Sequence, residues 1–440
     1  MKPVVSLIKY KNLDSIAQLI AMCDGFSNLK QNNRVLLKPN ICTAQAGFFP
    51  PFGTVTTTKV MEGTIVALKE FGIDDIAIGE GTVLDELGTN TKQGYRWIHL
   101  NKLQKRYGVK LLDFNRGPHK KIVVEGVPMN VAAAALDTDF FINLPVLKTH
   151  IAARISLSSK NLKGCLSMAS KKYFHGKDNS LHNHIARLME TVPQHLVIID
   201  GIYVMDYGPD ASTGTAHTKG VILSSKDFFA ADCVGTRLLG GEPRDVEHLK
   251  LYAERHKRVD VLNNTGAIEV LGEKVEDNTK FVPWLAITGK DLKDQGHTGI
   301  EIKEIRSTVC SGCYANLTGP TLLLSALSKK RDFDDLRVII GKNLKENRDT
   351  PRTLLFGKCA INENKHLENA TRLTGCPPSF FKSVFYLINQ MKGRMNRLVF
   401  YRKLLPYFVK STLRIGMLPL ERYEIYKNNP DFDIDHFRVS

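Results

Sequence analysis

The chain has 440 residues, of which 43% are hydrophobic and 24% are charged, and its formal net charge is +16. This length allows two or three domains with real cores, and this composition excludes a disordered or fibrous protein. The apolar run near the N-terminus is too short for a secretory signal, and no run approaches the roughly 20 apolar residues that span a bilayer. We therefore expect a cytoplasmic protein whose cysteines stay reduced unless they bind metal.

Strands and helices are predicted to alternate along the first half of the chain. Apolar segments predict strands over residues 4–8, 35–38, 76–78, 109–113, 140–144 and 196–199, and helices over 13–22, 58–71 and 97–107. Strands that alternate with helices pair in parallel through right-handed crossovers. The expected fold class is therefore α/β, a mostly parallel sheet with helices on both faces.

Polar residues follow several of these strands, and open α/β sheets bind ligands beyond the carboxyl ends of their strands. The residues predicted to bind substrate are Lys38, Asn40, Glu80, Lys160, Asn161 and Lys163. The residues predicted to act in catalysis are Lys148, His150 and Asp200. Lysines in such positions are costly to bury without anionic partners, so carboxylate or phosphate is the expected ligand class.

Each of these side chains also has a plainer interpretation. The lysines are compatible with solvated surface charges, and His150 with a structural histidine in place of a general acid or base. Asp200 is equally suited to cap the turn that it begins with Gly201. Glu80 lies between two glycines, which allow the backbone to approach a ligand closely. Histidines lie at 175, 182 and 184, but the spacing of His182 and His184 does not place both on one helical face, so we do not expect a histidine metal site.

Four cysteines in the C-terminal third have settings that ordinary packing does not explain. Cys310 and Cys313 are separated by two residues, Cys359 ends a predicted strand over 353–357, and Cys376 precedes two prolines. The paired spacing is typical of zinc and iron–sulfur sites, and Cys-Pro recurs in bacterial ferredoxins. We expect an iron–sulfur cluster in the [4Fe–4S] form, with zinc and simple burial as the alternatives. The other cysteines are assigned to packing.

This C-terminal segment is predicted to form a smaller α/β unit. Its predicted elements are a helix over 314–328, strands over 337–341 and 353–357, and a helix over 363–373. The predicted domains are 1–300, which binds the anion, 301–378, which carries the cysteines, and 379–440, a basic helical tail.

The tail carries eight basic residues and no acid between residues 379 and 420. Apolar residues at helical spacing there predict a helix that packs on the protein's own core or contacts an anionic membrane or an acidic redox partner. Nucleic acid is not an expected partner, because no recognition motif accompanies the charge.

An ordered set of short motifs resembles one family, the domain of unknown function 362, over residues 35–240. The motifs are Lys38-Pro39-Asn40, Gly79-Glu80-Gly81, the segment 144–150 that ends in Lys148-Thr149-His150, Lys160-Asn161-Leu162-Lys163-Gly164, Asp200-Gly201-Ile202 and Ser224-Ser225-Lys226-Asp227. The resemblance implies an iron–sulfur protein but no established reaction. Many members carry compact ferredoxin-type cysteine repeats, whereas the cysteines here are spread over the separate C-terminal segment.

Together these features predict an iron–sulfur redox enzyme that acts on or with an anionic small molecule. One alternative is an electron carrier or cluster-bearing accessory protein without catalysis of its own. A second alternative is a zinc-stabilised acid/base enzyme without redox chemistry. No Gly-x-Gly-x-x-Gly fingerprint follows the first strand, so a dinucleotide site is not expected.

Overall fold

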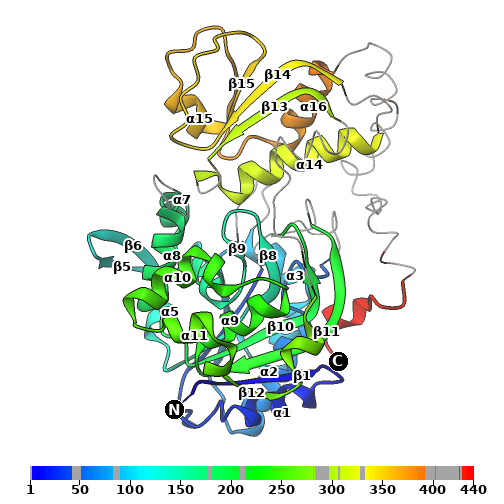
Figure 1. The fold of residues 1–440 in the computed structure, drawn as a ribbon. Coiled ribbons are helices and arrows are strands. Elements are labelled where there is room, and N and C mark those ends of the chain that lie inside the picture. The colour runs from blue at the N-terminus through cyan, green and yellow to red at the C-terminus, as the bar shows by residue number, and fades with distance from the viewer. Residues whose placement is uncertain are drawn as a thin grey trace.

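The structure is a computed structural model of the 440-residue chain. It describes residues 2–41, 51–82, 90–175, 180–208, 214–280, 282, 297–305, 308–327, 332–391, 402, 426 and 429–440. A large sheet and a small sheet organise these residues, and they lie at opposite ends of the molecule (Figure 1).

Among the described residues, ten strands form the large sheet, whose main path runs β12-β1-β11-β10-β7-β2-β3-β4. The strands are β1 Val4–Lys9, β2 Val35–Pro39, β3 Ile76–Glu80, β4 Lys110–Asp113, β7 Phe140–Leu144, β8 Val146–His150, β9 Arg154–Ile155, β10 Leu196–Met205, β11 Ala216–Ser225 and β12 Glu269–Gly272. The pairs β10–β7, β7–β2, β2–β3 and β3–β4 are parallel, and β11 pairs antiparallel with β1 and β10. The expected mostly parallel sheet is confirmed.

Helices cover both faces of this sheet. Side chains that alternate along a strand point to opposite faces, so apolar side chains lie on both faces and helices bury them. Leu36 of β2 belongs to one apolar core, and its neighbour Leu37 belongs to another. The helices α1 Asp14–Met22, α2 Thr58–Glu70, α3 Thr91–Trp97 and α4 Leu100–Tyr107 contribute to the core of Leu37. The helices α8 Ser180–Thr191, α9 Phe228–Leu238, α10 Glu247–Arg255 and α11 Val259–Asn263 contribute to the core of Leu36.

Short elements complete this part of the chain. They are the hairpin β5 His119–Val124 and β6 Val127–Ala132, with the helices α5 Ala133–Asp137, α6 Ser158–Asn161, α7 Met168–Tyr173 and α12 Val275–Asn278. The helix predicted over 97–107 is two helices, α3 and α4, because His99 between them adopts a left-handed conformation with φ of 59°.

The small sheet is entirely parallel, in the order β13-β14-β15-β16. Its elements are β13 Thr298–Glu304, α14 Ser311–Leu327, β14 Asp332–Ile340, β15 Thr353–Phe356, α15 Gly357–Glu363, β16 Thr371–Leu373 and α16 Phe380–Gln390. The helix predicted over 363–373 is wrong. Residues 371–373 instead pair with Leu354–Phe356, so the gain from completing a sheet overrides the helical pattern.

The predicted basic tail begins with α16, which packs into the small unit. Val384, Leu387 and Ile388 are buried, and the ring of Phe380 lies against Gly319 of α14. Residues 392–401 and 403–425, which hold most of the basic residues, lie outside the described residues. Membrane contact by this segment therefore stays a prediction. Within the described parts of the chain, no helix is long and apolar enough to cross a bilayer.

The last residues of the chain return to the large sheet, close to α2 (Figure 1). The rings of Phe432 and Phe437 lie 5.1 and 5.5 Å from that of Phe52. The backbone nitrogen of Asp433 donates to the Tyr203 hydroxyl at 2.8 Å. The C-terminal segment is thus part of the core of Leu37, although it lies within the predicted tail.

Candidate functional site

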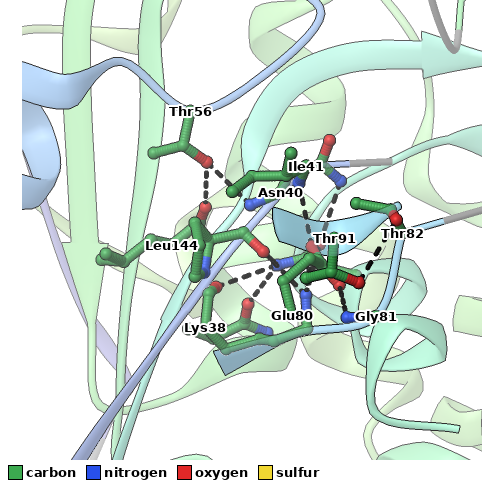
Figure 2. A network of polar contacts seen from close by, with 12 residues as sticks. Lys38, Asn40, Ile41, Thr56, Glu80, Gly81, Thr82, Thr91 and Leu144 are labelled. Atoms are coloured by element: carbon green, nitrogen blue, oxygen red, sulfur yellow. Dashed lines mark hydrogen bonds and ion pairs between the residues drawn. The ribbon is translucent and has the colours of Figure 1, made fainter. Parts of the chain in front are cut away.

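A buried ion pair joins the ends of β2 and β3. Lys38 is fully buried and Glu80 is 2% exposed, and Nζ of Lys38 lies 2.8 Å from Oε2 of Glu80 (Figure 2). The backbone nitrogens of Ile41 and Gly81 also donate to this carboxylate, at 2.8 and 2.7 Å. Because an unpaired charge is costly in such a place, each residue satisfies the other. Lys38 therefore binds the protein's own carboxylate.

Asparagine side chains extend this pair into a network. Asn40 donates to Oδ1 of Asn161 at 2.9 Å, and Asn161 donates to Oδ1 of Asn143 at 2.7 Å. Nζ of Lys148 donates to Oδ1 of Asn40 at 3.0 Å and to the carbonyl oxygen of Thr54. These contacts bring together the predicted residues Lys38, Asn40, Glu80, Asn161 and Lys148. The network holds the ends of β2, β3 and β8 in fixed positions, as buried polar groups require partners.

Asp200 is buried on the other face of the large sheet. Its carboxylate accepts from the backbone nitrogens of Thr57 at 2.7 Å and Ile202 at 3.1 Å. Thr57 is the N-cap of α2, and α2 covers the face opposite to Lys38. Burial raises the pKa of Asp200 from 3.8 to about 6, although both hydrogen bonds act to lower it. The structure therefore does not bring Asp200 together with His150, and it assigns the carboxylate to capping.

This raised pKa predicts a pH-dependent contribution to stability. The folded protein binds the Asp200 proton more tightly than the unfolded chain, so its contribution is present below pH 4 and is lost as pH rises to about 6. Between pH 4 and 7 the free energy of unfolding of the wild type should therefore fall relative to Asp200→Asn by up to about 3 kcal/mol. Denaturant unfolding of both proteins across this range checks it. A pH-independent difference would contradict it.

His150 ends β8 and is 1% exposed. Its Nδ1 accepts from the backbone nitrogens of Ala152 and Ala153, at 3.1 and 3.2 Å, so the neutral ring carries its proton on Nε2. Burial, and then the positive charges of Lys160 and Lys163, lower the pKa of His150 well below its usual value. The predicted residues His150, Lys160 and Lys163 thus act on one another, and Lys148 of the Lys38 network also acts on His150.

His175, which follows α7, joins this second group. Nζ of Lys163 lies 2.8 Å from Nε2 of His175 and 5.9 Å from the centre of the Phe174 ring. Burial, and then the charges of Lys163, Lys160 and Lys342, lower the pKa of His175 well below its usual value. Lys342 follows β14 of the small unit. The group therefore includes residues from both parts of the chain.

The four predicted cysteine ligands come from three segments that are joined by hydrogen bonds. Cys310 and Cys313 lie at the start of α14, Cys359 lies in α15, and Cys376 lies in the turn before α16. Asn316 of α14 donates to the carbonyl oxygen of Pro378 at 2.7 Å. The backbone nitrogen of Lys358 donates to the carbonyl oxygen of Gly375 at 2.9 Å. These hydrogen bonds hold the three segments together.

The thiols act on one another electrostatically. The pKa of Cys313 is raised well above its usual value by its hydrogen bond with Cys310, by burial, and by the charges of Cys310, Cys359 and Cys376. The pKa of Cys310 is lowered to about 6, mainly by that hydrogen bond and also by backbone nitrogens and the charge of Lys163. The pKa of Cys313 thus depends on the other three cysteines, and that of Cys310 depends on Lys163.

A thiolate-bound metal centre is compatible with this donor set. Gly357, with φ of +85°, brings backbone so close that a Cβ there would lie 3.2 Å from Sγ of Cys313. Among the described residues, no three His, Cys, Asp or Glu side chains are arranged to hold a single metal ion. One tetrahedral ion needs its sulfurs roughly 2.3 Å from a common point, whereas a [4Fe–4S] cluster binds each thiolate through a different iron atom. The four cysteines fit the second arrangement in kind and number.

Comparison with known proteins identifies the segment that carries the lysine motifs. Residues 35–237 match the domain of unknown function DUF362. A thylakoid-associated protein of Synechocystis is 27% identical to this chain over 239 residues, which are 53% of this chain and 72% of that protein. The match confirms the resemblance drawn from the ordered motifs. The four cysteines lie outside the DUF362 segment.

Two solved structures resemble part of the chain weakly. The lactate racemase apoprotein of Thermoanaerobacterium thermosaccharolyticum has 11% identity and a TM-score of 0.32, and the match covers 50% of this chain and 54% of that one. A protein of Thermotoga maritima has 12% identity and a TM-score of 0.31, and the match covers 57% of this chain and 60% of that one. The chain thus spans little more than half of either structure.

Sequence reasoning missed His175 and Lys342, the two further residues found near His150 and Lys163. His175 belongs to the DUF362 segment, but its separation from the other histidines pointed only to the absence of a metal site. Lys342 directly follows β14, so its place at a strand end was a signal of the same kind as that of Lys148. Its proximity to His175 depends on how the two sheets are placed, which local sequence does not encode.

Proposed function

We propose that this chain is an iron–sulfur redox protein in which Cys310, Cys313, Cys359 and Cys376 bind a [4Fe–4S] cluster. In this proposal, the DUF362 segment binds an anionic small molecule, a carboxylate or a phosphate, beside that cluster. The observation that supports it most is that hydrogen bonds from Asn316 to Pro378 and from Lys358 to Gly375 hold together the three segments that carry the four cysteines. A cationic group beside a thiolate centre suits a reaction between the cluster and an anion.

The side chains have distinct roles in this proposal. The bound cluster would supply or accept one electron at a time. Lys160 and Lys163 would attract the anion to the same place. Burial lowers the pKa of Lys163 well below its usual value, and the negative charge of a bound anion would favour its ammonium form. His150, a neutral imidazole with its proton on Nε2, would donate a hydrogen bond that stabilises the charge of the reduced anion. Lys148 and the Lys38–Glu80 pair position β8 and β2 beneath it. We assign Asp200 no part in the chemistry.

An electron carrier or cluster-bearing accessory protein is the second candidate. It is favoured by the thylakoid association in the name of the Synechocystis relative, together with the eight basic residues between 379 and 420. Such a protein would contact an anionic membrane or an acidic redox partner through that segment. Flotation with anionic liposomes, with and without residues 392–425, tests this contact. Unchanged binding after the deletion would remove the membrane role.

The cluster is tested by metal analysis of protein purified without oxygen. We expect iron and acid-labile sulfide in about equal amounts and little zinc. Cys359→Ala should lose most of the iron, whereas Cys233→Ala, which removes a fully buried thiol from the large unit, should keep it. Zinc in place of iron, lost in the same variant, would support the zinc-stabilised acid/base enzyme instead. Equal iron in both variants would contradict the ligand assignment.

Replacing His150 with alanine should separate catalysis from cluster binding. If His150 donates a hydrogen bond to the reacting anion, turnover should fall by about 100-fold or more while iron content and cluster absorbance stay unchanged. The measurement is the change of a co-purifying or added anionic metabolite after mixing with reduced protein. A metabolite that never changes in the wild type would favour the carrier. An active His150→Ala protein would exclude His150 as the donor.

A further inference from the structure

A buried hydrogen-bond donor without a partner points to a binding site. His175 is 5% exposed, and its Nδ1 is buried with no hydrogen-bond partner. Its Nε2 lies 2.8 Å from Nζ of Lys163. Burial lowers the pKa of Lys163 well below its usual value, and an anion bound beside it would favour the charged ammonium, which can only donate, so that Nε2 accepts and Nδ1 carries the proton. A buried N–H without an acceptor destabilises the protein. An acceptor atom beside Nδ1 would remove this cost.

The surrounding groups favour an anion as the source of that acceptor. His150 has a second buried imidazole whose remaining nitrogen, Nε2, is a donor because backbone nitrogens occupy Nδ1. The charged groups that act most strongly on His175 are Lys163, Lys160 and Lys342, and all are cationic. The neighbourhood therefore presents donors and positive charge toward His175. An oxyanion supplies several acceptor oxygens and the opposite charge together.

The position of these groups relates the site to both parts of the chain. Lys163 and His175 come from the segment around α7, whereas Lys342 belongs to the small unit. Figure 1 shows α7, β8 and β9 at the end of the large sheet that faces the small unit. The charge of Lys163 acts on Cys310. An anion held here would lie beside Lys163 and within electrostatic range of Lys342 and Cys310.

We propose that His150, Lys163 and His175, together with Lys342 of the small unit, form one binding site for a compact oxyanion, a carboxylate or a phosphate group. His175 Nδ1–H donates to its oxygens, His150 lines the site, and the two lysines neutralise its charge. This differs from the strand-end set centred on Lys38, whose charge Glu80 already satisfies. The inference deepens the proposed function and depends on it only for what the bound anion does.

The test is calorimetric titration of the anaerobically purified, iron-analysed protein at constant ionic strength. Inorganic phosphate and acetate serve as the two probes, and chloride serves as the reference anion. We expect saturable binding of at least one probe, weakened about tenfold or more in His175→Phe, because about 1.4 kcal/mol corresponds to tenfold. Lys342→Gln should weaken it several-fold. Lys121→Gln, which removes an exposed lysine from β5, should leave it unchanged.

Each outcome decides between the two proposals. Lys342→Gln provides the decision if His175→Phe fails to fold, since Lys342 is partly exposed and its loss leaves no cavity in a core. Neither probe binding, or binding that is equal in wild type, His175→Phe and Lys342→Gln, would overturn this inference even if iron is present. If protein purified without oxygen contains no iron but still binds a probe, and the variants weaken that binding, the anion site is supported and only the proposed cluster is contradicted.

Discussion

Glu80→Gln is expected to lower the free energy of unfolding by about 3–5 kcal/mol, because it leaves a buried charge without its partner. Lys38 is fully buried, and the carboxylate 2.8 Å away is its only ionic partner among the described residues. The glutamine also replaces an oxygen that accepts hydrogen bonds from backbone nitrogens with a group that can only donate. Equilibrium denaturation in urea measures the loss.

Two further variants separate charge from packing. Lys38→Met should cost a similar amount alone, and the double variant should cost clearly less than the sum, because no unpaired charge remains. Asp75→Asn is the matched control: Lys110 and Asp75 form a pair of the same 2.8 Å length, but both are well exposed. Its cost should be about 1 kcal/mol or less. A Glu80→Gln protein as stable as Asp75→Asn would contradict the assigned role of the pair.

Gly357→Ala is expected to reduce the iron content of anaerobically purified protein several-fold. The new Cβ would lie 3.2 Å from Sγ of Cys313 and 3.4 Å from Cδ of Pro378, so it would push apart two of the segments that carry cysteines. The positive φ of 85° adds a backbone cost of roughly 1–2 kcal/mol. Iron per chain and the free energy of unfolding are both measured.

Gly108→Ala controls for the backbone cost. Gly108 ends α4 with φ of +72°, and a Cβ there would meet nothing within 4 Å. Both variants should therefore lose similar stability from the left-handed conformation, but only Gly357→Ala should lose iron. Equal iron in the two proteins would show that the glycine beside Cys313 has no part in forming a metal centre.

Much of the large sheet was predictable because its strands are short apolar runs that end at Pro, Gly or polar residues. The parallel order also placed the ends of β2, β3 and β7 together, so Lys38, Asn40 and Glu80 were correctly grouped. Their chemistry was harder to predict. Opposite charges at the ends of adjacent parallel strands indicate an ion pair at least as well as a substrate site, and the structure forms the pair.

Other features depend on tertiary context that local patterns do not contain. Asp200 was predicted to follow a strand, but it lies within β10, and the alternation of side chains turns it to the face of α2, where the backbone nitrogens of Thr57 and Ile202 donate to it. β16 is three residues long and is stable only because β15 offers it an edge. Phe432 and Phe437 belong to the core of Leu37 and their rings contact that of Tyr203, although they lie some 230 residues after it in the sequence.

The most direct test of the central claim is electron paramagnetic resonance of the anaerobically purified, dithionite-reduced protein, with iron, sulfide and zinc quantified on the same sample. We predict the signal of a reduced iron–sulfur cluster in the wild type and its absence in Cys359→Ala. Colourless, iron-poor protein that gives no signal, or a signal unchanged in Cys359→Ala, would contradict a cluster bound by these four cysteines.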